Sequence, residues 1–269
     1  MEKNSFLKIT VVGISVFVMT SYAKDKEISA ETLINKSVQA LHVKQEDSIY
    51  TMRLLDKEGK EEGKRKMRVW FKSQTDDDAK LMIKFMEPAN IRGTGLLTIL
   101  EKSKDPDQWL YLPAYKKIRR VKSGNESESF LGTDFTMADI SVQRESNFEY
   151  KIQGTEKCGQ NDCYVLIGVP KPDVDKDTLS YSRKKLLIRK DNHLNIRTEF
   201  YSTEDLQKIE KVMTLHGIQK DKADKWLVNK IEMKNETTHH STVLEFDKRD
   251  ISKTPADQFF TQSFLEKGV

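Results

Sequence analysis

The sequence predicts a mainly β protein built around one long antiparallel sheet. Apolar and polar residues alternate with a period of two, clusters of turn residues separate these runs, and no regular succession of strands and helices indicates a parallel sheet. In residues 64–72, for example, Met67, Val69 and Phe71 share one face and Trp70 lies on the other. We expect roughly eleven or twelve strands. They are expected at residues 49–56, 64–72, 79–87, 94–100, 109–112, 148–154, 164–169, 184–190, 196–201, 208–217, 226–234 and 242–246.

The first residues predict a cleavable signal peptide, residues 1–23. Lys3 and Lys8 precede an almost unbroken apolar run, and small residues lead to a cleavage site after Ala23. The apolar run is shorter than the roughly 20 residues that cross a membrane. No cysteine stands at the cut to accept a lipid. We therefore expect an exported protein in which residues 24–269 form a single β domain.

Both ends of the mature chain are expected to pack on the sheet. A helix is expected over residues 30–43, with Ser29 as its N-cap and Glu31 in its first turn. Its apolar residues form one stripe, so the helix lies on another element. It either covers the mouth of the sheet or is an ordinary part of the core, and the sequence favours neither. Residues 255–265 are rich in phenylalanine and should tuck onto the sheet as a helical turn or an extended tail.

The composition excludes few classes of function, but it argues against nucleic-acid binding. The formal net charge is +4, and 33% of the residues are charged, which suits a globular domain with a solvated surface. Nucleic-acid binding would need a basic patch interleaved with aromatic residues. The short basic runs at 64–66 and 183–185 have acidic residues nearby, so we interpret them as solvated strands or loops.

The two cysteines flank a turn-like sequence. Cys158 and Cys163 enclose Gly-Gln-Asn-Asp between two strand-like runs. In an exported protein this pattern favours a structural disulfide at a hairpin tip. A redox role is the less favoured alternative, and a metal site needs more ligands than one such pair.

The sequence gives no support for catalysis, a metal or a cofactor. The five histidines show no zinc-binding spacing, and no nucleophile elbow or phosphate loop is present. His239 and His240 are expected in a surface turn, pointing opposite ways. Asp134 and Asp139 could form a carboxylate pair, but their spacing beside Gly132 suits capping and turn chemistry better. We therefore expect a protein that is not an enzyme.

Residues 88–139 carry the most specific signal in the chain. A proline, an Arg-Gly pair, an apolar strand, a Trp-x-Tyr-x-Pro run, an Arg-Arg pair and a Ser-Phe-x-Gly-Thr-Asp-Phe run follow one another in order. The matched positions are Pro88, Ile91, Arg92, Gly93, Leu96, Leu97, Trp109, Tyr111, Leu112, Pro113, Arg119, Arg120, Ser129, Phe130, Leu131, Gly132, Thr133, Asp134, Phe135 and Asp139. This stretch resembles the family of bacterial outer-membrane lipoprotein-sorting-like proteins, relatives of the periplasmic carrier LolA.

The resemblance implies a half-open antiparallel β-barrel with an N-terminal helix and short helical lids. It also implies a periplasmic carrier that binds the acyl chains of a lipid or lipoprotein and moves them towards the outer membrane. Its partners would be those acyl chains and, in addition, an inner-membrane transporter and an outer-membrane acceptor, with the carrier itself a monomer. No cofactor is implied.

The expected acyl-chain cavity rests on strands that carry apolar residues on both faces. Methionine would suit such a soft cavity, although any single apolar residue is more often plain core. The residues expected to line the cavity are Leu81, Ile83, Phe85, Leu97, Ile99, Trp109, Tyr111, Phe130 and Phe135. The remaining signature residues either set the strand and loop geometry or contact cargo and partners; they are Pro88, Arg92, Gly93, Pro113, Arg119, Arg120, Gly132, Asp134 and Asp139.

Two other functions remain open on the sequence. The same fold could serve as a module that senses lipids or lipoproteins and signals to a membrane protein. A hydrolase of the cell envelope is the third possibility, and it would depend on Asp134 or Asp139.

Overall fold

The computed structural model describes residues 28–75, 78–101, 106–121, 127–140, 145–172, 174, 180–221 and 224–267. The expected signal peptide, residues 1–23, lies outside the described residues.

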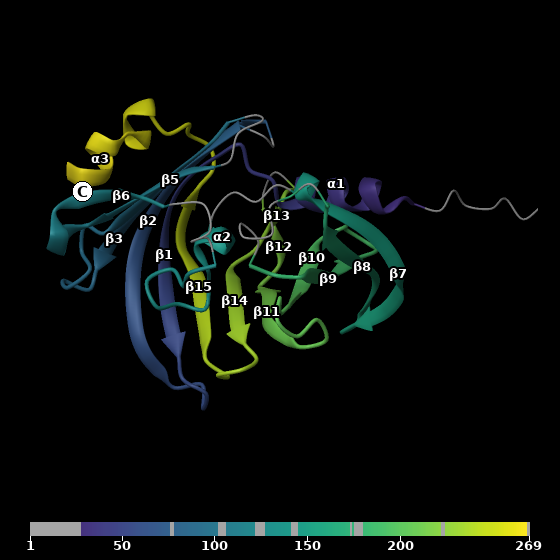
Figure 1. The fold of residues 1–269 in the computed structure, drawn as a ribbon. Helices are drawn as coiled ribbons and strands as arrows, with labels where there is room; N and C mark the ends of the chain where they lie inside the picture. The colour runs from purple at the N-terminus through teal and green to yellow at the C-terminus, as the bar shows by residue number, and fades with distance from the viewer. Residues whose placement is uncertain are drawn as a thin grey trace, which may run out of the picture.

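β-Strands dominate the described part of the chain (Figure 1). They are β1 (Gln45–Leu55), β2 (Glu61–Thr75), β3 (Asp78–Glu87), β4 (Gly95–Leu100), β5 (Asp107–Leu112), β6 (Lys117–Arg120), β7 (Phe148–Cys158), β8 (Asn161–Pro170), β9 (Arg183–Arg189), β10 (Asn195–Tyr201), β11 (Ile209–His216), β12 (Gln219–Lys220), β13 (Trp226–Leu227), β14 (Lys230–Asn235) and β15 (Ser241–Asp250). The helical elements are α1 (Ala30–Leu41), α2 (Met137–Ile140), α3 (Gln262–Lys267), η1 (Pro113–Tyr115), η2 (Glu145–Asn147) and η4 (Asp257–Phe260). None of the helices in the described part is long and apolar enough to cross a membrane.

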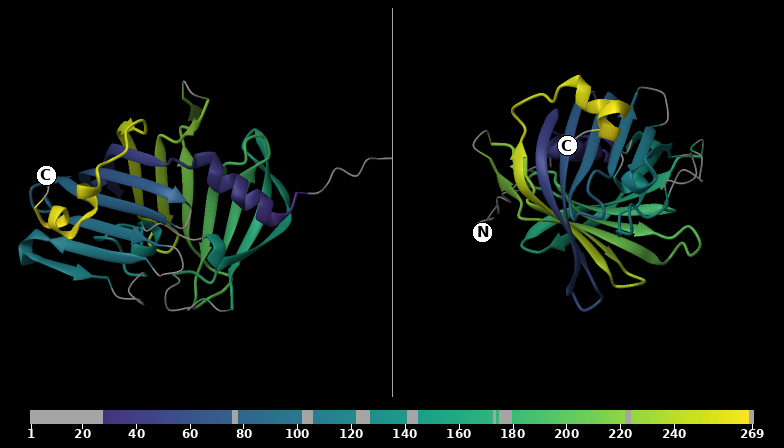
Figure 2. Two further views of the ribbon diagram at one scale, coloured as in Figure 1. Left: turned by 90° about the horizontal axis from the view of Figure 1, so that it is seen from above. Right: turned by 90° about the vertical axis from the view of Figure 1, so that its left-hand side faces the viewer.

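One curved antiparallel sheet organises the molecule. Its strand order is β6-β5-β4-β3-β2-β1-β15-β14-β11-β10-β9-β8-β7, so two meanders meet where β1 pairs with β15. Strands β6 and β7 are its two edges and do not pair with each other, and the sheet therefore curls without closing (Figure 2). This confirms the predicted mainly β, half-open antiparallel barrel with an N-terminal helix and short helical segments.

The two faces of the sheet are both apolar but are covered by different segments. Successive residues of a strand point to opposite faces, and residues paired across strands share one. Met52 and its partner Leu244 lie in a buried cluster on the concave side, which we call the inner face. Trp70, Met82 and Leu97, which are paired in that order across β2, β3 and β4, lie in a second cluster on the opposite, outer face.

The C-terminal segment covers part of the outer face. The ring of Trp70 has the rings of Phe259 and Phe264 at centroid distances of 5.2 and 5.4 Å. Leu265 of α3 is fully buried in the same cluster. The expected packing of this segment is confirmed, and it consists of the short helices η4 and α3.

Helix α1 covers a different region, on the inner face. Ser29 caps it as expected, because its side chain accepts a hydrogen bond from the backbone N–H of Thr32 at 3.1 Å. Leu33 and Ile34 are buried in a cluster that includes Leu166 of β8. Register through β9, β10, β11, β14 and β15 places this part of β8 on the same face as the Met52 cluster. The helix thus lies over one arm of the inner face.

Two strand expectations were wrong. Strand β6 was missed because its Lys-Ile-Arg-Arg sequence contains a single apolar residue and shows no alternation. The expected strand at 226–234 is two strands, β13 and β14, separated by Val228 and Asn229. Strand β13 pairs with β12 in a separate two-stranded ribbon, which the continuous apolar run Trp226–Leu227 and Val228 concealed.

Candidate functional site

A segment that is not part of the sheet lies against the centre of the inner face. Between edge strands β6 and β7 the chain includes residues 127–140, which we call the plug segment and which contain α2. Figure 1 shows α2 between the two arms of the curved sheet. Phe130, Phe135 and Met137 are almost completely buried, with exposed fractions of 0%, 4% and 5%, in the same cluster as Met52 and Leu244. These three side chains of the plug segment pack directly into the apolar inner face.

Local hydrogen bonds give the plug segment its compact shape. The backbone N–H of Phe130 donates to the carbonyl of Phe135 at 2.8 Å, and Ser129 forms an isolated bridge with Thr136. The turn between them has two successive left-handed residues, Leu131 at a φ of +52° and Gly132 at a φ of +74°, and glycine adopts this conformation without cost. Thr133 closes the turn by donating its hydroxyl to the carbonyl of Phe130 at 2.8 Å.

Asp134 fastens the plug segment to β15. Its backbone N–H donates to the hydroxyl oxygen of Thr242 at 3.0 Å, and the same hydroxyl donates to the Asp134 carboxylate at 2.7 Å. Nδ1 of His240 lies 2.7 Å from the same carboxylate oxygen. Asp134 is only 6% exposed and Thr242 is fully buried. A buried carboxylate with two such partners is a strong and directional anchor.

Arg65 of β2 is a second anchor. Its guanidinium donates to the backbone carbonyl of Leu131 at 2.9 Å. Burial lowers the pKa of Arg65, and among the described residues no carboxylate counteracts this shift. A charged side chain thus contacts the plug segment through a carbonyl alone. The sequence carried one signal of this: Arg65 continues the alternation of Met67 and Val69, so an arginine stands at an inner-face position.

Asp139 and Tyr181 form a third anchor. The Asp139 carboxylate accepts a hydrogen bond from the N–H of Thr136 at 2.8 Å, and its own N–H donates to the Thr136 hydroxyl at 3.1 Å. This reciprocal arrangement caps the start of α2, in line with the capping chemistry expected of Asp139. The hydroxyl of Tyr181 donates to the same carboxylate at 2.8 Å. Burial and the nearby carboxylate raise the pKa of Tyr181 well above its usual value.

The structure brings together five of the nine residues expected to line one cavity. They belong to the buried inner-face cluster and are Leu81, Ile83, Phe85, Phe130 and Phe135. The first three lie on β3, whereas the two phenylalanines belong to the plug segment that covers them. The rings of Phe85 and Phe130 have their centroids 6.0 Å apart.

The other four residues lie on the outer face, in contact with the C-terminal segment. They are Leu97, Ile99, Trp109 and Tyr111. Register accounts for the difference, because Leu97 pairs with Met82 and with Trp109 across β3, β4 and β5. Both faces of these strands are apolar. The hydrophobic periodicity of the sequence therefore cannot show which face the plug segment covers and which face the C-terminal segment covers. The nine residues expected to line one cavity are therefore divided between the two faces of the sheet.

The signature residues outside the plug segment shape the end of the sheet that holds β5 and β6. Gly93 has a φ of +83°, and a Cβ at this position would lie 3.4 Å from Pro113. The turn after β3 and the turn after β5 therefore touch. Arg92 donates from Nε to the carbonyl of Met86 at 3.0 Å, and Arg120 forms an ion pair with Asp107. Pro88 follows Glu87 at the end of β3, and Arg119 is exposed on β6.

One histidine expectation was wrong. His239 is exposed, as expected for a surface turn. His240 is instead 25% exposed and bonded to Asp134, because the strand β15 that begins at Ser241 carries it next to the plug segment. A residue 106 positions away supplies the partner, and sequence patterns cannot show such a pairing.

The two cysteines form a disulfide in the structure. Cys158 ends β7, and Cys163 lies in β8 after a tight turn. The pair is remote in the fold from the plug segment, at the hairpin between β7 and β8.

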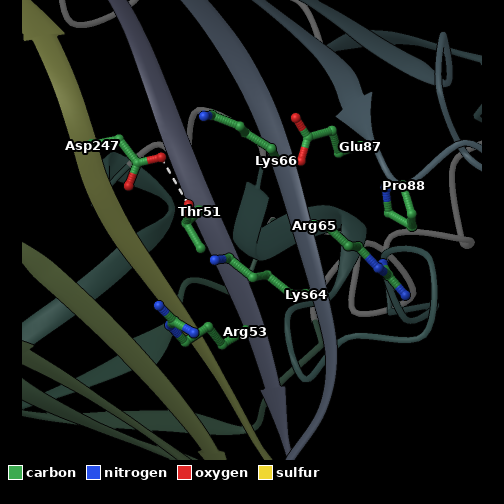
Figure 3. A pocket seen from close by; sticks show the side chains of 8 residues that line it. All are labelled: Thr51, Arg53, Lys64, Arg65, Lys66, Glu87, Pro88 and Asp247. Atoms are coloured by element: carbon green, nitrogen blue, oxygen red, sulfur yellow. Dashed lines mark hydrogen bonds between the residues drawn. The ribbon is translucent and has the colours of Figure 1, made fainter.

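A polar groove of about 480 Å³ lies along β1 and β2, mostly on their outer face (Figure 3). Its lining residues are Thr51, Arg53, Lys64, Arg65, Lys66, Glu87, Pro88 and Asp247. Figure 3 shows Lys64 and Arg65 pointing to opposite sides of β2, as alternation requires. Cations and carboxylates are mixed in this groove, which makes it a poor place for an acyl chain. Among the described residues, no three histidine, cysteine, aspartate or glutamate side chains lie close enough to hold a metal ion.

Comparison with known proteins places this geometry in a family. A family model described as that of an uncharacterized protein matches residues 77–267. No curated protein matches the chain. A proposed outer membrane lipoprotein-sorting protein domain from Vibrio parahaemolyticus superposes with a TM-score of 0.79 at 24% identity, over 89% of this chain and 98% of that one.

Two further solved structures are similar over most of the chain. A DUF1329 family protein from Desulfovibrio piger gives a TM-score of 0.77 at 25% identity, covering 88% of this chain and 99% of that one. A LolA superfamily protein from Nitrosomonas europaea gives 0.68 at 17% identity, again with 88% and 99% covered. The half-open sheet and the family match agree with the signature at residues 88–139. The chain therefore belongs to the family whose model matches residues 77–267, and its fold is LolA-like.

Proposed function

We propose that this protein is a non-enzymatic carrier that binds the acyl chains of a lipid or a lipoprotein on its inner face. The observation that carries the proposal is the covered state of that face. An apolar, concave surface is occupied by three apolar side chains of a segment that is not part of the sheet. Such a segment can move aside without breaking a strand, and its departure would leave an apolar surface for a ligand.

The energies of plug displacement and cargo binding are of similar size. Exposing a buried Phe or Met costs about 1.5–3 kcal/mol, so displacing Phe130, Phe135 and Met137 costs about 5–9 kcal/mol. Each methylene of an acyl chain that takes their place contributes about 0.8 kcal/mol. A chain of about ten methylenes therefore offsets the displacement. Binding of this kind is reversible, as a carrier requires.

The polar anchors favour a single closed position of the plug segment. Arg65, Asp134 and Asp139 hold the segment through hydrogen bonds at defined positions. Apolar packing alone would allow many positions, whereas buried polar contacts have directional geometry. The name of the Vibrio parahaemolyticus domain, a lipoprotein-sorting protein, supports cargo of the same class.

The remaining parts of the proposal come from the sequence. The protein would be exported by the signal peptide at 1–23 and would act in the periplasm as a monomeric domain over 24–269. It would receive its cargo from an inner-membrane transporter and pass it to an outer-membrane acceptor.

The direct test is native mass spectrometry of the protein purified from its own periplasm, followed by lipid extraction. A carrier should contain a stoichiometric acylated ligand, or should take up a triacylated peptide offered to the empty form. A protein that binds none of the acylated probes would contradict the proposal.

A matched pair of variants tests the role of the plug segment. Arg65→Gln removes the bond to Leu131 and should make uptake of the triacylated peptide faster. Arg53→Gln is the control, because Arg53 lies on the neighbouring strand but bonds to Glu61 and Glu245 on the outer face. Equal uptake rates in the two variants would show that the segment does not gate binding. A vesicle-to-vesicle transfer assay then separates a carrier, which moves lipid, from a sensing module, which binds lipid without net transfer.

A further inference from the structure

The hairpin of β5 and β6 projects from one end of the sheet. We call residues Pro113–Tyr115 and 116–120 the basic hairpin; it includes η1 and the edge strand β6. In Figure 1 and in the left view of Figure 2 it lies at the far left, near the C-terminus. Because β6 pairs only with β5, its other side faces away from the sheet. The hairpin thus presents an unpaired strand edge at one end of the sheet.

An exposed aromatic ring stands at the tip of this hairpin. Tyr115 is 69% exposed, the highest exposed fraction among the large hydrophobic residues of the described chain. Within the described residues its ring stacks on no other ring and its hydroxyl takes part in no hydrogen bond. Tyrosine carries both an apolar ring and a polar tip, and such a side chain is favoured at the boundary between water and lipid.

Four cationic side chains lie within the five residues after Tyr115 in the sequence. Lys116, Lys117, Arg119 and Arg120 are all exposed. Only Arg120 has a carboxylate partner, Asp107, among the described residues. Arg92 adds a further exposed cation from the turn after β3, which touches the hairpin where Gly93 meets Pro113. The tip is therefore strongly positive, unlike the groove on β1 and β2, where carboxylates are interspersed.

A lysine occupies a left-handed backbone position at the tip of the hairpin. Lys116 has a φ of 48°, in the left-handed region, which is less favourable for a residue with a Cβ than for glycine. Glycine would be the easier residue at this turn. A lysine held at that cost is consistent with a use for its charge, and the position offers a substitution that separates binding from stability.

Protection of the sheet edge explains only part of this pattern. Lysine and arginine on an edge strand hinder pairing with a second chain, and this accounts for Lys117 and Arg119 on β6. Tyr115 and Lys116 precede the strand, so edge protection does not account for them. An exposed aromatic residue would itself promote association.

We propose that the basic hairpin docks the protein on an anionic phospholipid surface. The ring of Tyr115 enters the headgroup region, and Lys116, Lys117 and Arg119 lie over the lipid phosphates. This goes beyond the carriage of acyl chains and rests on the hairpin alone. It gives the carrier a means to meet a membrane with its inner face still covered.

The test is flotation of the purified protein with vesicles. Vesicles of phosphatidylglycerol and phosphatidylcholine should carry the protein upwards, pure phosphatidylcholine should carry much less, and raising the salt from about 0.05 to about 0.3 M should release it. Each cation near such a surface contributes about 5-fold in partitioning, so Lys116→Gln with Lys117→Gln should lower it about 25-fold. Tyr115→Ser should lower it as well.

Two controls make the result specific. Lys151→Gln with Lys208→Gln removes two exposed lysines from the other arm of the sheet and should leave flotation unchanged. Lys116→Gly should weaken flotation about 5-fold while the protein becomes no less stable in urea. Equal loss in the hairpin and control variants would overturn the proposal, and so would unchanged flotation accompanied by oligomerisation of the hairpin variant. A protein that binds acylated peptide but not anionic vesicles would refute the docking proposal and leave the carrier proposal intact. A protein that binds anionic vesicles through the hairpin but no acylated peptide would support docking and refute the carrier proposal.

Discussion

The Asp134 carboxylate and the His240 imidazole, 106 residues apart in the chain, meet at 2.7 Å on the inner face of the sheet. One belongs to the plug segment and the other precedes β15. The contact therefore joins the plug segment to the central strands of the sheet. Thr242 completes the arrangement from the same strand end, with a hydroxyl that both accepts from and donates to Asp134.

We predict that Asp134→Ala lowers the free energy of unfolding by about 3 kcal/mol. The change removes two hydrogen bonds to a charged group and leaves the buried Thr242 hydroxyl without an acceptor. Urea unfolding followed by tryptophan fluorescence measures the loss. His240→Ala should cost less, and the double variant should show a coupling energy of about 1–2 kcal/mol. Strictly additive losses would mean that the two side chains do not act together.

Sequence alone could predict the strands but not how the two faces are covered. The alternation of Met67, Val69 and Phe71 shows which residues of β2 share one face, and Ser29 marks the start of α1. Leu97 and Tyr111 obey the same alternation, yet they face the C-terminal segment. The coverage depends on where a distant helix docks, and no local pattern encodes that.

The anchors of the plug segment show the same limit more sharply. Asp134 could be singled out from the signature, but its partners Thr242 and His240 come from a hairpin far along the chain. Arg65 was visible only as an arginine on an apolar face. Strand β6 was hidden because basic side chains suit an exposed edge and leave no hydrophobic period.

We predict that Gly95→Ala loosens the C-terminal helix. A Cβ at Gly95 would lie 2.7 Å from Cδ of Lys84, 2.8 Å from Cδ1 of Leu265 and 3.0 Å from the carbonyl oxygen of Ile83. The carbonyl oxygen of Ile83 belongs to the sheet and cannot move aside. The added Cβ therefore displaces Leu265, and with it α3, at a cost of about 1–3 kcal/mol. Urea unfolding gives the cost, and a change in the fluorescence of Trp70, which packs on Phe264, would report the shift.

Gly154→Ala is the matched control for this substitution. Gly154 also lies in a strand, β7, but a Cβ there meets no atom within 4 Å. Alanine should be tolerated or slightly stabilising, because it reduces the freedom of the unfolded chain. A loss at Gly154 as large as that at Gly95 would show that the Cβ contacts with α3 are not the cause.

We predict that removing the disulfide has a modest effect. Cys158 and Cys163 are five residues apart, so the bond closes a small loop. The chain-entropy model gives about 2 kcal/mol for a loop of this size. Cys158→Ser with Cys163→Ser should lower the free energy of unfolding by about that amount, measured in urea without reductant. Binding of acylated peptide should not change, because the bond lies at a hairpin tip away from the plug segment. Loss of peptide uptake at full stability would contradict this.

We predict that stability rises with pH through the titration of Lys84. Its side chain is fully buried on the outer face and donates to the carbonyls of Gly93 and Leu265 at 2.9 and 2.6 Å. Burial lowers the pKa of Lys84 from 10.5 to about 8. Below about pH 8 both the folded and the unfolded forms are protonated, and the cost of burying the charge is present in full. Between about pH 8 and 10.5 only the unfolded form keeps the proton, so the free energy of unfolding rises by up to about 3 kcal/mol. Urea unfolding across this range should show the rise in the wild type and in Lys80→Met, a change on the same strand, but not in Lys84→Met. A rise of equal size in Lys84→Met would assign the titration to another group.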